Sequence, residues 1–226
     1  MKLLVLEGLD GAGKSTQINM IQELLISKNI KYKYLHFPRT DSPVWGELIS
    51  MFLRGELGNI ETVNPYLAAL LYAGDRNDAK NIINNWLNDG YTVILDRYVY
   101  SNIAFHCAKF EKSEDKIKLK NWIKKVEFEH NALHVPDLSL FLDVPFEFTV
   151  TKLTERRNGK DREYLNGHDD IHEKNINFQN QVRNEYLSLV AEENKFVLIK
   201  CSDDNHKILS QNKIFEKIKS ELEKYL

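Results

Sequence analysis

The stretch Gly8-Leu-Asp-Gly-Ala-Gly-Lys-Ser15 decides the fold of this chain. It matches the pattern G-x-x-x-x-G-K-[ST], in which glycines allow backbone N–H groups to surround phosphate oxygens. It follows a short apolar run, Lys2–Glu7, and opens a segment in which Ile18, Ile21 and Leu25 recur at helical spacing. A strand, a glycine-rich loop and an amphipathic helix in that order predict a binding site for a nucleoside triphosphate.

Several side chains of this loop have expected roles. Lys14 bridges the outer phosphates, and the Ser15 hydroxyl completes the oxygen shell of a magnesium ion. Asp10 orients the phosphoryl acceptor and its water shell. The residues expected to contact ATP are Gly8, Asp10, Gly11, Ala12, Gly13, Lys14, Ser15 and Thr16.

The rest of the chain alternates short apolar runs with longer amphipathic stretches. This alternation predicts an α/β fold of three layers, a P-loop NTPase fold with a five-stranded parallel sheet flanked by helices. No Pro- or Ser-rich linker divides residues 1–226, so we expect a single domain. The charged segment Glu111–Asn131, with Ile117, Trp122, Ile123 and Val126 as its apolar face, is expected to be a surface helix. The expected strands after the first are Lys31–Phe37, Thr92–Asp96, Leu138–Val144 and Lys195–Lys200.

The composition excludes several classes of protein. The 226 residues include 31 Lys and Arg against 33 Asp and Glu, a net charge of -2, which argues against nucleic acid as the partner. No apolar run approaches the roughly 20 residues that a membrane span needs, so no membrane is expected either. Cys107 and Cys201 lie far apart in the sequence and are expected to be packing residues. These features together predict a cytoplasmic protein.

Two further motifs end predicted strands and indicate the acceptor. Asp96-Arg97 follows the third strand, and Phe37-Pro38-Arg39 follows the second. Ligands of open α/β sheets bind at the carboxyl ends of the strands, so both arginines are expected to face the phosphate loop. Two guanidinium groups there favour an acceptor that already carries a phosphate. Asp96 is expected to contact the magnesium ion or the acceptor.

Two pairs of residues at helical spacing are candidates for binding a base. Tyr72 and Arg76 are four residues apart, so a ring and a guanidinium share one helix face. Asn102 and Phe105 are three residues apart on the helix after the third strand, and they could offer an amide to a base edge and a ring to the sugar. Taken alone, each pair is more typical of ordinary packing. A GTPase is excluded because the base-binding pattern N/T-K-x-D is missing.

Together these motifs resemble the thymidylate kinase family over essentially the whole chain. The resemblance rests on Glu7–Thr16, Phe37–Arg39, Leu71–Arg76 and Asp96–Asn102 in that order and at that spacing. It implies transfer of the γ-phosphoryl group of ATP to dTMP, giving dTDP for dTTP biosynthesis, and it implies a homodimer. It also implies the substrate-binding residues, which are Phe37, Arg39, Tyr72, Arg76, Arg97, Ser101, Asn102 and Phe105. The family commonly has Phe at the position of Tyr72.

A basic segment near residues 155–167 is interpreted as a short mobile lid. Some family members place an arginine inside the phosphate loop, where this chain has Gly11 and Ala12. The resemblance therefore implies that the lid supplies the charge that stabilises the transferring phosphoryl group. The candidate catalytic residues are Asp10, Lys14, Arg97, Arg156, Arg157 and Arg162, with Lys160 as a further lid cation.

Two other interpretations of the chain remain open from the residues alone. One is a deoxynucleoside kinase that acts on an unphosphorylated nucleoside, and the other is a nucleotide-binding subunit without turnover. The histidine pairs His130/His134 and His168/His172 have a spacing that can hold a metal, but we expect exposed helix residues because kinase chemistry uses magnesium and oxygen ligands.

Overall fold

A parallel five-stranded sheet forms the centre of the computed structural model, which describes residues 2–59, 62–154, 164–166, 170–172 and 175–226. The strand order is β2-β3-β1-β4-β5, and every neighbouring pair is parallel. The strands are β1 (Leu3–Gly8), β2 (Tyr32–His36), β3 (Thr92–Asp96), β4 (Leu138–Asp143) and β5 (Phe196–Lys200). All five strands were expected from the sequence, with bounds that differ by at most one residue.

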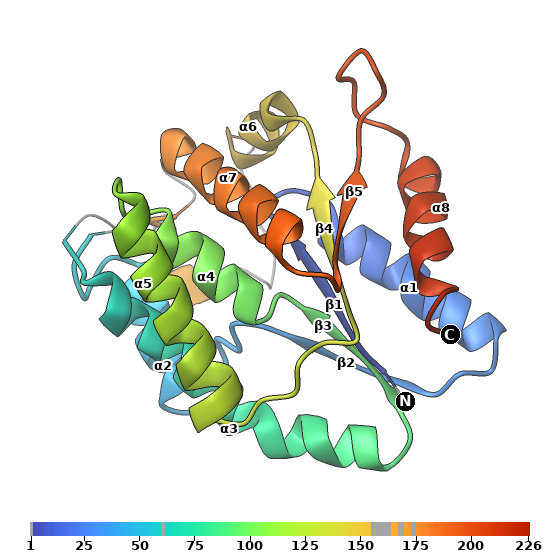
Figure 1. Cartoon of the computed structure of the whole chain (residues 1–226), viewed down its shortest axis with the longest axis horizontal. Helices are drawn as coiled ribbons and strands as arrows, with labels where there is room; N and C mark the ends of the chain where they lie inside the picture. Colours follow the sequence, from blue (N-terminus) through green and yellow to red (C-terminus); the bar gives the residue numbers. More distant parts are fainter. Residues whose placement is uncertain (1, 60–61, 155–163, 167–169, 173–174) are drawn as a thin grey trace.

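Helices cover both faces of this sheet, which confirms the expected α/β fold (Figure 1). On one face lie α1 (Lys14–Ser27) and α8 (Gln211–Leu222). The helices on the other face are α3 (Pro65–Asn88), α4 (Val99–Cys107), α5 (Ser113–Lys124) and α7 (Ile176–Glu192). Two further helices are α2 (Trp45–Leu53), which packs on α3, and α6 (Phe146–Thr154), which follows β4.

The hydrophobic core lies in two layers, one on each side of the sheet. Leu3 and Val5 of β1 point into the layer under α3, α4 and α7, whereas Leu4 and Leu6 point into the layer under α1 and α8. This alternation buries β1 completely, as expected of a central strand covered by helices on both faces. The carboxyl ends of β1 and β3 are thereby fixed side by side, which positions the loops that follow them.

The segment after α4 differs from the expected surface helix. Helix α5 passes at Lys125 into a π-helix, η1 (Lys125–His130). Ile117 was expected to face inward, but it is 51% exposed, so that prediction was wrong. Glu127 is instead fully buried, because its carboxylate is bound by polar side chains of α3 and α4. Charge along a helix does not reveal which carboxylate has a buried partner.

None of the helices in the described part of the chain combines the length and the apolar character that a membrane crossing requires. Both cysteines are buried and free, in agreement with their expected packing role.

Candidate active site

The loop between β1 and α1 forms one end of the site. Gly13 has φ +82° at the start of α1, a conformation that glycine adopts without strain. The Lys14 ammonium folds back over the loop, 3.2 Å from the carbonyl oxygen of Leu9 and 3.4 Å from that of Gly8. Burial, together with the nearby Arg97, lowers the pKa of Lys14. This loop offers backbone N–H groups and the positive end of a helix to an anion.

Arg97 follows β3 and lies directly beside this loop. Its φ of +67° is unusual for a residue with a side chain, and such conformations cluster at functional sites. The guanidinium binds Asp10, with Nη2 to Oδ1 at 2.5 Å, and donates from Nη1 to the Gly8 carbonyl oxygen at 2.8 Å. Burial would lower the pKa of Arg97, but the neighbouring carboxylates, Asp10 above all, raise it. Arg97 is therefore a buried, permanently charged group that contacts Asp10 of the phosphate loop on one side and the ring of Phe105 on the other.

A buried polar network underneath Arg97 was not predicted from the sequence. The Glu7 carboxylate accepts hydrogen bonds from the Ser101 hydroxyl, the Tyr186 hydroxyl at 3.0 Å and the Tyr98 amide at 3.0 Å. Burial raises the pKa of Glu7. Tyr186 comes from α7, far away in sequence, so no local pattern could have indicated it. The network holds Arg97 in place, because Arg97 Nη1 donates to the Ser101 hydroxyl at 3.3 Å and to the Tyr186 hydroxyl at 3.5 Å.

Asp96 and Ser15 are the candidate oxygen ligands for a metal ion beside the loop. Asp96 Oδ2 lies 3.3 Å from His36 Nδ1, while its buried Oδ1 has no hydrogen-bond partner among the described residues. Burial would raise the pKa of Asp96, but Lys14 and His36 lower it, so the group is an anion. Asp96 and Ser15 line one cavity, and a carboxylate oxygen without a partner and a hydroxyl in that cavity fit magnesium, which prefers oxygen ligands.

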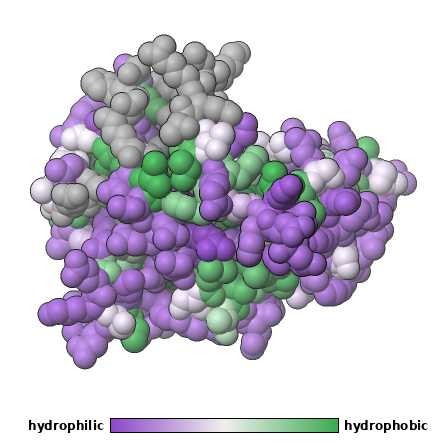
Figure 2. All heavy atoms as spheres, turned by 90° about the horizontal axis from the view of Figure 1, so that it is seen from above, coloured by the Kyte–Doolittle hydropathy of each residue, from purple (hydrophilic) through white to green (hydrophobic). Residues whose placement is uncertain are grey.

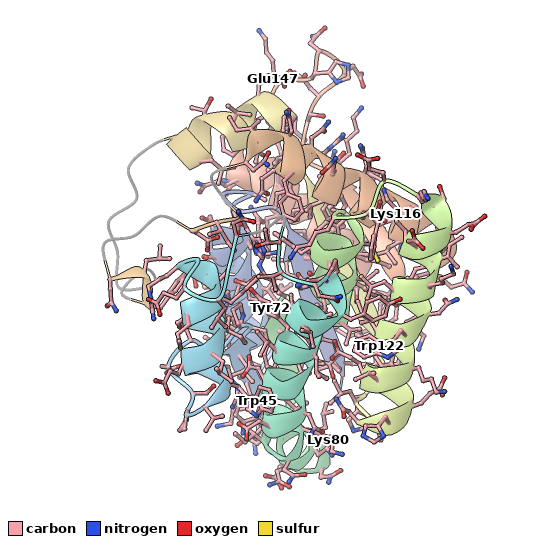
Figure 3. The ribbon with its side chains drawn as sticks, turned by 90° about the vertical axis from the view of Figure 1, so that its left-hand side faces the viewer. Trp45, Tyr72, Lys80, Lys116, Trp122 and Glu147 are labelled. Atoms are coloured by element: carbon pink, nitrogen blue, oxygen red, sulfur yellow. The ribbon has the colours of Figure 1, made fainter. Side chains whose placement is uncertain are left out.

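The expected base-binding residues line the same cavity at its other end. Tyr72 of α3 is in ring contact with His106, with centroids 5.4 Å apart, and Figure 3 shows Tyr72 above Trp45 on the side formed by α2 and α3. Phe105 packs against the Arg97 guanidinium, 5.1 Å from its ring centroid. Arg76 and Asn102 complete this wall from α3 and α4. The structure therefore brings together two pairs that the sequence could not connect.

Arg39 lies differently from the other expected residues. Its guanidinium binds Asp75 at 2.8 Å and Asp78 at 2.6 Å, and it does not line the cavity in this structure. Phe37, two residues earlier, does line it.

A single cavity of about 740 Å³ joins these parts. Hydrophilic side chains cover most of the face that Figure 2 shows, with smaller hydrophobic areas between them. The expected residues that line the cavity are Asp10, Gly11, Ala12, Gly13, Lys14, Ser15, Thr16, Phe37, Tyr72, Arg76, Asp96, Arg97, Ser101, Asn102 and Phe105. Lining residues that sequence reasoning missed include Tyr34, His36, Lys152, Tyr164, Asp170 and His172.

His172 corrects one expectation from the sequence. It was predicted to be an exposed helix residue, but it lies in a turn, is 5% exposed and contacts the rings of Phe52, Phe105 and Phe178. Burial lowers its pKa to about 3. Within the described ranges, no group of three or more His, Cys, Asp or Glu side chains could hold a metal ion.

The basic residues assigned to the lid, Arg156, Arg157, Lys160 and Arg162, lie outside the described residues.

The fold and the loop between β1 and α1 define a P-loop NTPase. A family model described as thymidylate kinase matches residues 6–213. The probable thymidylate kinase 1 of Saccharolobus solfataricus is 31% identical over 213 residues, covering 93% of this chain and 94% of that protein. The thymidylate kinase of Mycobacterium tuberculosis is 30% identical over 190 residues, covering 84% of this chain and 86% of that protein.

A solved structure of thymidylate kinase from Candida albicans matches the fold with a TM-score of 0.73 at 25% identity, covering 99% of this chain and 91% of that one. The chain belongs to the thymidylate kinase family. It is thus an ATP-dependent phosphotransferase that acts on a nucleoside monophosphate.

Proposed function

We propose that this chain transfers the γ-phosphoryl group of ATP to dTMP in a magnesium-dependent reaction, and that the cavity described above holds both nucleotides. The observation that carries this proposal is that the phosphate loop and the Tyr72–Arg76 wall line one cavity, with Arg97 between them. Phosphoryl transfer needs positioning and charge neutralisation more than a covalent intermediate. The cavity offers both.

On the donor side, the loop amides and the start of α1 hold the phosphates of ATP. Lys14 turns from the Gly8 and Leu9 carbonyl oxygens toward the outer phosphates, which are stronger acceptors. Ser15 and Asp96 would hold the magnesium ion, and the partnerless Oδ1 of Asp96 supports this assignment. When bound, the ion neutralises charge on the phosphate oxygens.

On the acceptor side, Arg97 grips the phosphate of dTMP. Its bond to Asp10 keeps the guanidinium in place before the nucleotide arrives and leaves Asp10 near the reacting groups. Arg39 also binds this phosphate only if its guanidinium leaves Asp78. That carboxylate is half exposed and is therefore a weak partner. A bare nucleoside needs neither arginine.

The thymine ring stacks on Tyr72, and Arg76 and Asn102 bind its polar edge. Phe105 packs beside the sugar, where a ring leaves little room for a second hydroxyl group. Ser101 contributes through Glu7 and Arg97, to which its hydroxyl is bonded.

The segment 155–167 closes over the phosphates as a lid within a single domain spanning residues 1–226, and Arg156, Arg157, Lys160 or Arg162 neutralises the transferring group. Replacing each of the four with alanine tests this role. At the decisive position kcat falls far more than nucleotide affinity, and an unchanged kcat in all four variants would exclude it.

The chain forms a homodimer in the cytoplasm. Leu67, Leu70 and Ile82 of α3 are 64%, 44% and 42% exposed, which supports an apolar contact on α3. Ile49 and Phe52 of α2 are already buried within the chain, so the exposed apolar residues that support this contact lie on α3. Light scattering at micromolar concentration tests this, and a monomer would contradict it.

Release of ADP from magnesium-ATP, measured with a panel of nucleosides and monophosphates, tests the proposed reaction. We expect turnover with dTMP well above that with thymidine. A preference for thymidine would favour a deoxynucleoside kinase, and no turnover with any acceptor would favour a subunit without activity.

A further inference from the structure

The buried carboxylate of Glu127 joins the two residues at the base end of the cavity. It accepts hydrogen bonds from Arg76 Nε and Nη2, both at 2.6 Å, and from Asn102 Nδ2, also at 2.6 Å. Glu127 is fully buried and does not line the cavity. It lies in the π-helix η1, a widened helical turn of the kind often found at functional sites.

These bonds determine which way the Asn102 amide points. Its Nδ2 donates to Glu127 Oε1 and, at 3.1 Å, to the carbonyl oxygen of Ala69, so both amide hydrogens face acceptors in the wall. Its buried Oδ1 has no hydrogen-bond partner among the described residues. A buried acceptor without a partner is unfavourable unless a ligand supplies the donor. Since Asn102 lines the cavity, its Oδ1 is the acceptor that this side chain leaves for a ligand.

Glu127 also restricts Arg76. Because Nε and Nη2 are bound to the carboxylate, Nη1 is the guanidinium nitrogen that Glu127 leaves for other partners. The wall thus offers a donor from Arg76 next to an acceptor from Asn102. This pattern matches a base edge with a carbonyl oxygen beside an N–H group, as thymine and uracil have. Cytosine has the reverse pattern, an amino group beside an unprotonated nitrogen.

We propose that Glu127 is a positioning residue that sets base specificity, because it holds Asn102 and Arg76 in the donor and acceptor arrangement that admits thymine and rejects cytosine. The proposal rests on the proposed function for the identity of the substrate. Glu127 touches no nucleotide and acts only through these two side chains.

A carboxylate is required because it is an acceptor at both oxygens. An amide at this position turns its N–H groups either toward Arg76 Nε or toward Arg76 Nη2 and Asn102 Nδ2. In either case Arg76 or Asn102 loses a hydrogen-bond acceptor, and its side chain takes a different orientation. Discrimination between base edges depends on such buried polar groups staying matched.

The test is the ratio of the Kd values for dCMP and dTMP, measured by calorimetry with the full chain and its E127Q variant. We expect E127Q to lower this ratio by about tenfold or more. The control is E129Q, an exposed glutamate on the same π-helix, which leaves the ratio unchanged. The ratio of dUMP to dTMP also stays unchanged in E127Q, since uracil and thymine share the same edge.

An unchanged dCMP to dTMP ratio in E127Q would overturn the proposal, because a purely structural carboxylate affects stability and not base preference. If E127Q does not fold, E127D replaces it, since it keeps the charge opposite Arg76. Its shorter side chain cannot reach all three nitrogens, and we expect a fall of about threefold to tenfold; an unchanged ratio in E127D again overturns the proposal. Turnover of dTMP by the parent chain separately tests the proposed function.

Discussion

Replacing His172 with phenylalanine is expected to change how stability depends on pH. The imidazole lies among Phe52, Phe105 and Phe178, and its Nε2 has no hydrogen-bond partner among the described residues. Burial, with a smaller contribution from the charge of Lys109, lowers the pKa of His172 from 6.5 to about 3. The folded chain therefore keeps this ring neutral at pH values where the unfolded chain protonates it.

The sign and size of the effect follow from this difference. Between pH 6.5 and pH 3 the unfolded state binds a proton that the folded state does not, so stability is lost as the pH falls. When the pH falls from about 7.5 to about 5, protonation of His172 in the unfolded chain lowers the free energy of unfolding by about 2 kcal/mol. Burial is also the main cause that lowers the pKa of His106, and because that residue is buried in both proteins, most of its contribution cancels in the comparison.

Urea unfolding of the parent and of H172F at both pH values measures this effect. We expect the parent to lose about 2 kcal/mol more than H172F between the two pH values. Equal losses in the two proteins would refute the assignment of a buried, neutral His172.

The remaining predictions concern the phosphate groups and the packing of α2 on α3. Lys14→Ala should lower kcat by at least roughly a hundredfold with a smaller change in ATP affinity, because the ammonium acts most on developing charge; steady-state kinetics measures this, and an unchanged kcat contradicts it. Arg97→Ala should raise KM for dTMP at least tenfold while KM for ATP changes less, since a charged contact to phosphate is lost; equal changes in the two KM values would count against it. Gly74→Ala should cost about 1–3 kcal/mol in thermal unfolding, because the added Cβ would lie 2.3 Å from the Trp45 ring; an unchanged Tm contradicts that packing.

The fold and the loop were predictable because their signals are local. The motif Gly8–Ser15 lies between a strand and a helix that are each marked by their own hydrophobic pattern, and the five apolar runs became the five strands. Asp96 and Arg97 were placed at the rim by one rule, that strand ends share an edge of the sheet. Such inferences need no knowledge of partners that are distant in the sequence.

The parts that were missed depend on contacts between distant segments. His172 has charged residues near it in the sequence, but in the structure it packs among rings from α2, α4 and α7. Glu127 lies in a charged segment, and its burial follows only from Arg76 and Asn102, 51 and 25 residues away. Arg39 follows the end of β2, but its guanidinium binds acidic residues of α3, and its motif could not predict those bonds.

The proposed function requires that one cavity holds both nucleotides, with Arg97 between their phosphates. A molecule that joins adenosine and thymidine through a chain of phosphates tests this most directly when its inhibition is measured at varied ATP and varied dTMP. We expect inhibition that is competitive against both substrates and at least tenfold weaker for Arg97→Ala. Inhibition that competes with only one of the two nucleotides would contradict it.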